Sequence, residues 1–141
     1  MSNTARSPLA AIQRAIYQRL SDDEELGAPV YDQVPEDAPM PYVVFGEATE
    51  TPSNWHGGFG RNSTHTLHAW SQQATFDEVN AIADRVVQLL DHQPLPLHAP
   101  EWVVTAVRFE FAQTLRDPHP PHARHVPIRF RVSTEQPEEE G

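Results

Sequence analysis

The stretch TFDEVNAIADRVVQLLDH, residues 75–92, decides the fold of this chain. Its apolar residues recur at steps of three and four, which places them on one side of an α-helix. They are Phe76, Val79, Ile82, Ala83, Val86, Leu89 and Leu90. Thr75 and Glu78 form a capping-box pattern at the start, and Pro94 cannot continue the helix at its end. We therefore expect an amphipathic helix whose apolar side covers a sheet.

Segments that favour β-structure lie on both sides of this helix. They are residues 30–33, 42–48, 64–70, 102–116 and 125–134. All are rich in β-branched or aromatic side chains, and the last alternates between apolar and polar residues. An earlier helix is predicted to begin with Ser7 as its N-cap and Pro8 at its first position, and its apolar stripe is Leu9, Ile12, Ile16 and Leu20.

The order of these elements predicts an α+β fold. Strands that follow one another can pair through hairpins, so we expect a mostly antiparallel sheet of four to five strands with two main helices packed on one face. With 141 residues the chain is long enough for one domain with a substantial core. We assign residues 8–134 to this domain, residues 1–7 to a flexible N-terminus and residues 135–141 to a disordered acidic tail.

The composition excludes several classes of chemistry. The chain has no cysteine, which rules out disulfides, thiolate metal sites and a cysteine nucleophile. It also has no lysine, which rules out a Schiff base or a P-loop. A net charge of −10 argues against a general nucleic-acid binder, because such proteins neutralise phosphates with basic residues. No apolar run reaches the length of a membrane span, so we expect no membrane partner.

The eight histidines raise the alternative of a small metal- or ligand-binding enzyme. His119, His122 and His125 lie three apart, but the prolines between them make this turn non-helical, so the spacing does not gather the rings. His65 and His68 are separated by an odd number of strand positions and should point to opposite faces. No nucleophile-elbow pattern surrounds any serine. We therefore predict no catalytic residue, no metal ion and no cofactor.

The remaining candidates are surface residues for interaction with other proteins. Residues 51–60 form a long glycine-containing hairpin loop with two aromatic side chains at its tip, Trp55 and Phe59. In the strand at 102–116, parity places Val103, Val107, Phe109 and Phe111 on one face and Arg108 and Glu110 on the other. Arg129 or Arg131 of the next strand could then lie across from Glu110. We select as tentative interaction residues Trp55, Phe59, Arg108, Glu110, Arg129, Arg131, His119 and His122.

Several motifs, taken in order, resemble those of the tail-completion family of long-tailed bacteriophages. They are LAAIQRAIYQRL (residues 9–20), VYDQVPEDAPMPYVVFGEATET (30–51), LHAW (67–70), AIAD (81–84), RFE (108–110), LRDP (115–118) and HVPIRFR (125–131). The resemblance covers residues 9–133. No single motif is specific, but their order and spacing together are. The chain departs from the family after Asp117 and Pro118, where HPPHARH replaces a turn that is often glycine-containing.

The resemblance implies a virion structural protein without catalytic residues. It implies a small α+β subunit that forms a homo-oligomeric ring, typically a hexamer, which caps the tail tube and joins it to the head connector. Its partners would be the tail tube protein and the connector or head-closure protein, and DNA would pass through the lumen without specific binding. The expected location is the head–tail junction of the virion, after assembly in the host cytoplasm. A head-closure ring and a subunit of a gene transfer agent remain open alternatives.

Overall fold

The computed structural model describes residues 4–118 and 122–137. Its elements in chain order are α1 (Leu9–Ser21), β1 (Val30–Tyr31), β2 (Tyr42–Pro52), β3 (Phe59–Ser71), α2 (Asp77–Leu90), β4 (Val103–Ala112), β5 (Leu115–Arg116) and β6 (Arg124–Gln136). The strands form one sheet in the order β1-β2-β3-β6-β4, and β5 also pairs with β6. The predicted α+β class is confirmed, with six strands rather than four to five, because the segment at 102–116 divides into β4 and β5.

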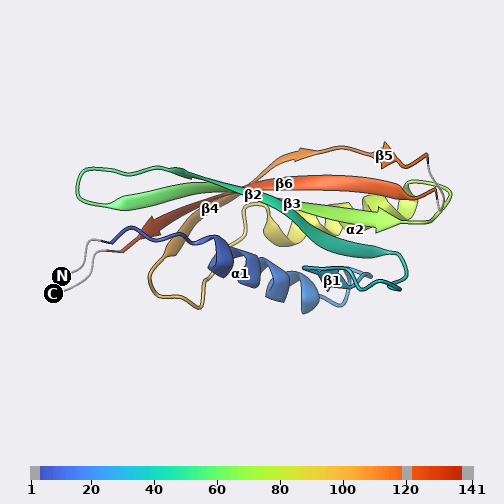
Figure 1. Cartoon of the computed structure of the whole chain (residues 1–141), viewed down its shortest axis with the longest axis horizontal. Helices are drawn as coiled ribbons and strands as arrows, with labels where there is room; N and C mark the ends of the chain where they lie inside the picture. Colours follow the sequence, from blue (N-terminus) through green and yellow to red (C-terminus); the bar gives the residue numbers. More distant parts are fainter. Residues whose placement is uncertain (1–3, 119–121, 138–141) are drawn as a thin grey trace.

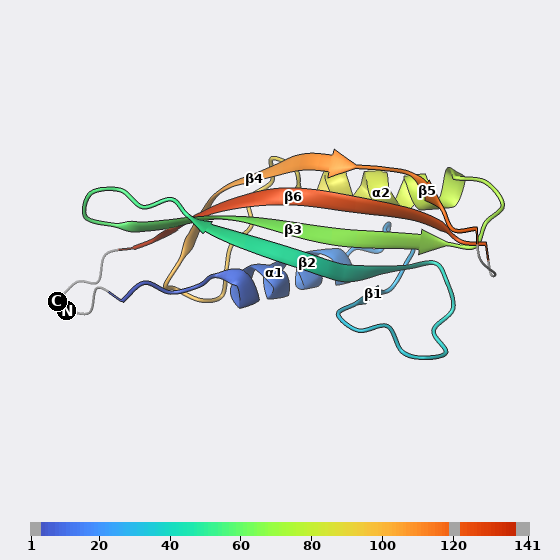
Figure 2. The same ribbon diagram turned by 45° about the horizontal axis from the view of Figure 1, so that its top comes forward.

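The sheet is antiparallel apart from one pair at its edge. β1 runs parallel to β2, whereas the pairs β2–β3, β3–β6 and β4–β6 are antiparallel. Both helices lie on the same side of the sheet (Figures 1 and 2). The long β2–β3 hairpin projects from one end of the molecule, where the end of β6 also lies (Figure 1). One face of the sheet, the covered face, is therefore packed against helices. The other, which we call the open face, carries no helix in the described residues.

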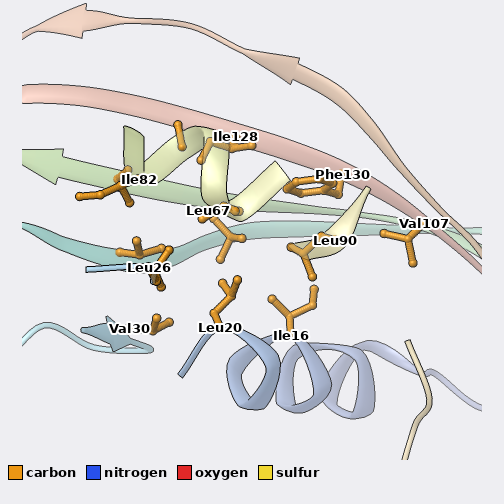
Figure 3. Close-up of a cluster of buried hydrophobic side chains, with 14 of the residues drawn as sticks. Ile16, Leu20, Leu26, Val30, Leu67, Ile82, Leu90, Val107, Ile128 and Phe130 are labelled. Carbon is orange, nitrogen blue, oxygen red and sulfur yellow. The ribbon is translucent and has the colours of Figure 1, made fainter. Parts of the chain in front are cut away.

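The core lies between the helices and the covered face of the sheet (Figure 3). α1 contributes Ile12, Ile16 and Leu20, and α2 contributes Val79, Ile82, Val86 and Leu90, as their apolar stripes predict. The largest fully buried side chain is that of Phe130 on β6. Ile128 and Val132, two positions before and after it on the strand, lie on the same face and are also buried. This shared core explains why two helices far apart in sequence occupy one layer.

The predicted cap residues bind the starts of both helices, because the Leu9 amide donates to Ser7 Oγ and the Asp77 amide donates to Thr75 Oγ1, both at 3.4 Å. The other half of the predicted capping box, the contact of Glu78 with Thr75, is wrong. The residues directly before the two helices, Pro8 and Phe76, make no side-chain cap hydrogen bond. Instead of reaching back to Thr75, the Glu78 carboxylate accepts a hydrogen bond from Ser71 Oγ at 2.7 Å. The Glu78 amide donates to Gln73 Oε1 at 3.1 Å. The loop before α2 therefore supplies the hydrogen bonds that a capping box would have supplied, and ties the helix to β3.

Two β-bulges in β4 overturn the predicted assignment of its faces. The pairing with β6 shifts register between Val104 and Ala106 and again between Phe109 and Phe111. Each bulge adds one residue, and one extra residue moves every following side chain to the opposite face. Val107 is buried opposite Val132, but Val103 is 53 % exposed, and Phe111 lies opposite Arg129 on the open face. The predicted placement of Val103 and Phe111 on the same face as Val107 is therefore wrong.

The C-terminal strand continues further than the predicted domain boundary. β6 extends to Gln136, which pairs with Phe59. The Gln136 side chain donates to the Thr4 carbonyl at 2.7 Å and accepts from the Arg6 amide at 3.1 Å. Residues 4–6 thus lie beside the end of β6, at the end of the molecule that carries the β2–β3 hairpin (Figure 1).

Candidate assembly surface

The open face of the sheet carries the charged cluster that the sequence predicts between β4 and β6. Glu110 accepts from Arg131 Nη2 at 2.8 Å and lies 3.4 Å from Arg129 Nε. The Arg129 guanidinium also lies over the Phe111 ring, 5.5 Å from its centroid. The bulge before Phe111 is what brings Glu110 within reach of both arginines, since it places the carboxylate between their two positions on β6.

This cluster has more positive than negative charge. Arg108 pairs directly across from Arg131 in the sheet, and its guanidinium donates to the Val107 carbonyl at 2.9 Å. Glu110 thus pairs with Arg129 and Arg131, whereas Arg108 lies across from Arg131 without an ion pair to Glu110. Like charges opposite each other in a sheet are unfavourable. The arrangement is thus suited to a partner surface that supplies further acceptors.

The predicted aromatic loop is a tight hairpin turn at the far end of β2 and β3. Trp55 and Gly58 exchange two backbone hydrogen bonds, of 3.2 and 3.1 Å, and Gly57 adopts a φ of 91° that favours glycine. The Trp55 indole lies so close to Gly58 that a Cβ atom there would collide with the ring. Trp55 still exposes 45 % of its surface, whereas Phe59 begins β3 and is half-buried.

Replacing Gly58 with valine is expected to displace the Trp55 indole from the turn, because the new side chain occupies the position of the ring. The free energy of unfolding should change by no more than about 1 kcal/mol, since the turn lies away from the core. The indole N–H resonance of Trp55 would report the displacement in an NMR spectrum. His56→Val, a substitution at an exposed position of the same turn, is the control and should leave that resonance in place.

The histidine turn after β5 does not form a metal site in the part of the chain that the structure describes. His119 lies outside the described residues. His122 is exposed, with a φ of 60°, and Arg124 donates to its carbonyl. No group of three or more His, Asp or Glu side chains among residues 4–118 and 122–137 could hold a metal ion. The predicted absence of metal, cofactor and catalytic residues stays a prediction.

A histidine pair on the open face was missed by the sequence analysis. His68 Nδ1 lies 2.7 Å from His125 Nε2, and the His125 ring stacks on Trp70 at 3.9 Å. The pKa of His125 is lowered to about 4, mainly by burial and also by the nearby His68, while Asp117 opposes the shift. The pair depends on the register that places Trp70 opposite His125. The spacing of residues along the chain carries no signal for it.

His65 points to the opposite, covered face of the sheet, as its odd separation from His68 predicts. Its ring is buried, and Nε2 lies 2.9 Å from Ser63 Oγ. Burial lowers the pKa of His65 to about 4, because an imidazolium ion would lose its hydration there. His65 is therefore neutral near pH 7 and acts as a polar residue of the core.

Comparison with known proteins places this architecture in a family. Residues 14–135 match the family model described as "Tail completion protein gp17". The tail completion protein gp17 of Bacillus phage SPP1 is 33 % identical over 111 residues, covering 76 % of this chain and 80 % of that protein. The chain belongs to the tail completion protein family. It is therefore a structural protein of phage tails and not an enzyme, as the motif resemblance implies.

A solved structure extends this result to phage-like particles. This chain is similar to a chain of the "Virion of native gene transfer agent (GTA) particle", with a TM-score of 0.81. That chain is 26 % identical to this one, and the alignment covers 93 % of this chain and 99 % of the other. None of the helices in the described residues is both long and apolar enough to cross a bilayer.

Proposed function

We propose that this tail completion protein assembles as a homo-oligomeric ring, a hexamer, that caps the tail tube and joins it to the head connector at the head–tail junction. The observation that carries the proposal is the match to the family over residues 14–135. Its physical counterpart is a sheet face that carries charged and aromatic side chains and no covering helix in the described residues (Figure 2). Surfaces of this kind are typical of proteins whose partners are other proteins.

Different parts of the subunit would serve different partners. The cluster of Arg108, Glu110, Arg129 and Arg131 offers charged donors and an acceptor on a rigid sheet, which suits a fixed protein–protein contact. The turn with Trp55 and Phe59 projects along the long axis of the molecule and would reach the tail tube or the connector (Figure 1). The His119 and His122 turn lies after β5, and we assign it to an axial contact as well.

The acidic character of the chain fits a lumen that DNA must cross. The net charge is −10, and phosphates are repelled by carboxylates. A ring of such subunits would let DNA slide without holding it. The ring would be part of the virion and would assemble in the host cytoplasm.

The test uses particles produced from a genome in which the gene for this chain is deleted, so that the particles lack the protein. We expect heads and tails that remain unjoined, and we expect purified protein to restore joining, with a ring of density at the tail end in electron micrographs. The variant Arg129→Glu/Arg131→Glu should reduce joining by about tenfold or more, because like charges then surround Glu110. The control Arg129→Lys/Arg131→Lys keeps the charge and should retain most of the activity.

The outcomes test the capping function and the contact made by the open-face cluster separately. If added wild-type protein does not restore joining, or binds the connector and never the tail tube, the capping function is wrong, and the second result would favour a head-closure ring. If the reversed variant joins heads to tails as well as wild type does, the open-face cluster is not a contact in the virion.

A further inference from the structure

The charge differs between the two sides of the sheet, since the β1–β2 side is acidic and the side formed by β4, β5 and β6 is basic. Residues 20–60 contain nine acidic residues and no arginine, whereas residues 102–134 contain five arginines and two acidic residues. The sheet order puts β1 and β2 at one edge and β4 at the other, and both views show these edges on opposite sides of the molecule (Figures 1 and 2). Acidic residues therefore gather towards the β1–β2 edge, and arginines gather on β4, β5 and the neighbouring strand β6, which carries three of the five.

Part of the acidic charge is neutralised within the subunit, but the edge itself stays negative. Arg85 of α2 binds Asp23 at 2.7 Å and lies 3.5 Å from Glu25. The loop between β1 and β2 holds three exposed carboxylates, Asp32, Glu36 and Asp37, and no basic residue. Asp32 accepts a hydrogen bond from Gln13 Nε2 at 3.1 Å, and the exposed Glu36 and Asp37 are available to a partner.

One side of the sheet exposes apolar side chains, and the other holds a groove. Four of the six large hydrophobic side chains exposed among the described residues lie on β4 and β5, namely Val103, Phe109, Phe111 and Leu115. The other edge holds a groove of about 380 Å³ between α1, β1 and β2. It is lined by Ala10, Gln13, Arg14, Tyr17, Asp32 and Phe45. A projecting apolar edge thus has a hollow counterpart, and Asp32 lies at its rim.

At the centre of the free edge of β4, backbone groups that an added strand would need are already hydrogen-bonded within the subunit. The His92 amide donates to the Val107 carbonyl at 2.9 Å, and the Phe109 amide donates to Asp91 Oδ1 at 2.8 Å. Such contacts prevent uncontrolled strand pairing at a sheet edge. A neighbour at this position must therefore bind through side chains, and Phe109, at 40 % exposure, is positioned for this.

We propose that the β4–β5 edge of one subunit docks on the β1–β2 edge of a second copy of this chain, with Phe109 in the groove beside Tyr17 and Phe45. Arg108 and Arg116 then face the carboxylates of Asp32, Glu36 and Asp37. Two different edges meet in this contact, so it is heterologous, and a heterologous contact repeated by rotation closes a ring. The inference rests on the proposed ring and names the surfaces that build it.

Cross-linking tests the contact directly, because the chain has no cysteine of its own. Gln113 and Gln33 are exposed, uncharged and located at the two edges. With tails present and a short bis-maleimide, Gln113→Cys/Gln33→Cys should give a ladder of covalent oligomers that stops at the ring number. Each single variant alone should remain monomeric, and a mixture of the two should give one dimer. The pair Gln113→Cys/Ala81→Cys places the second thiol on the exposed side of α2 and should give no ladder.

Charge exchange supplies a second test. Arg108→Glu/Arg116→Glu makes both edges acidic, and Glu36→Arg/Asp37→Arg makes both basic, so each variant alone should show cross-linking reduced by about tenfold or more. An equimolar mixture should recover it, because acidic and basic subunits can alternate around a ring with an even number of members, as a hexamer has. For these measurements each variant carries the two engineered cysteines.

The results distinguish this contact from the ring itself. Rings in micrographs without a ladder from the two glutamine positions would overturn the edge contact and leave the proposed ring standing. A dimer from Gln113→Cys alone would show a two-fold contact between like edges and would also overturn it. If wild-type protein forms no ring even with tails present, the ring and this contact are both wrong.

Discussion

Replacing Phe130 with alanine is expected to lower the free energy of unfolding by about 3–5 kcal/mol. The Phe130 side chain is fully buried at the centre of β6, with His65 directly across on β3 and the Phe109 ring edge-on at 6.0 Å on β4. Its removal leaves a cavity where three strands and the helical layer meet, and a rigid sheet cannot collapse to fill it. Denaturation with urea, followed by circular dichroism, measures the loss.

The matched control is Phe111→Ala on the neighbouring strand. Phe111 exposes 42 % of its surface and lies over Arg129 on the open face, so this substitution should cost no more than about 1 kcal/mol. If the two substitutions have equal effects, the core is not centred on β6, and the arrangement in Figure 3 is wrong.

The second large effect is a loss of stability as the pH falls from about 6.5 to about 4. The pKa of His65 is lowered from 6.5 to about 4 in the folded protein, because the ring is buried. Above pH 6.5 the imidazole is neutral in both states, and stability is full. Between the two values the unfolded chain binds a proton that the folded chain does not, so stability falls with pH. Complete passage through this window costs roughly 3 kcal/mol.

Other titrating groups act in the same direction but can be separated. His125 also has a pKa lowered to about 4, but it is more exposed, so solvent screening reduces its effect. Asp23 and Asp91 have lowered pKa values, the first through hydrogen bonds from Arg85 and the second through one from the Phe109 amide. Their contribution is present above the ordinary carboxylate pKa and is lost at lower pH than that of His65.

The variant His65→Gln keeps a polar partner for Ser63 and removes the titrating ring. Its free energy of unfolding should therefore vary less between pH 6.5 and 4 than that of wild type, by most of the 3 kcal/mol expected above. His56→Gln changes an exposed histidine of the hairpin turn and should retain the wild-type profile. A profile of His65→Gln that superimposes on wild type would show that burial of His65 is not the cause.

The ion pairs around Glu110 were predicted because successive β-segments tend to pair, so that their charged residues meet across the sheet. That Glu110 reaches both arginines is due to the bulge before Phe111, which was not predicted. The faces on which Val103 and Phe111 lie were not predicted, because a β-bulge leaves no periodic signal in the sequence. The alternation of apolar and polar residues does not reveal that one strand has an extra residue opposite its partner. The pair of His68 and His125 was missed for a related reason. Fifty-seven positions separate the two residues, and their meeting depends on the register of β3 against β6.

The sequence by itself determined the class of the fold, the two helices and the apolar stripes that bury them, because these follow from local periodicity and from the entropy and hydrogen bonding of each segment. Its motifs also indicated the family. Only the tertiary structure decided which charged and aromatic side chains share a surface, and that the acidic β1–β2 segment and the basic β4–β6 segment lie on opposite sides of one sheet. Strand order and register depend on contacts between distant segments, so neither can be read from the neighbours of a residue along the chain.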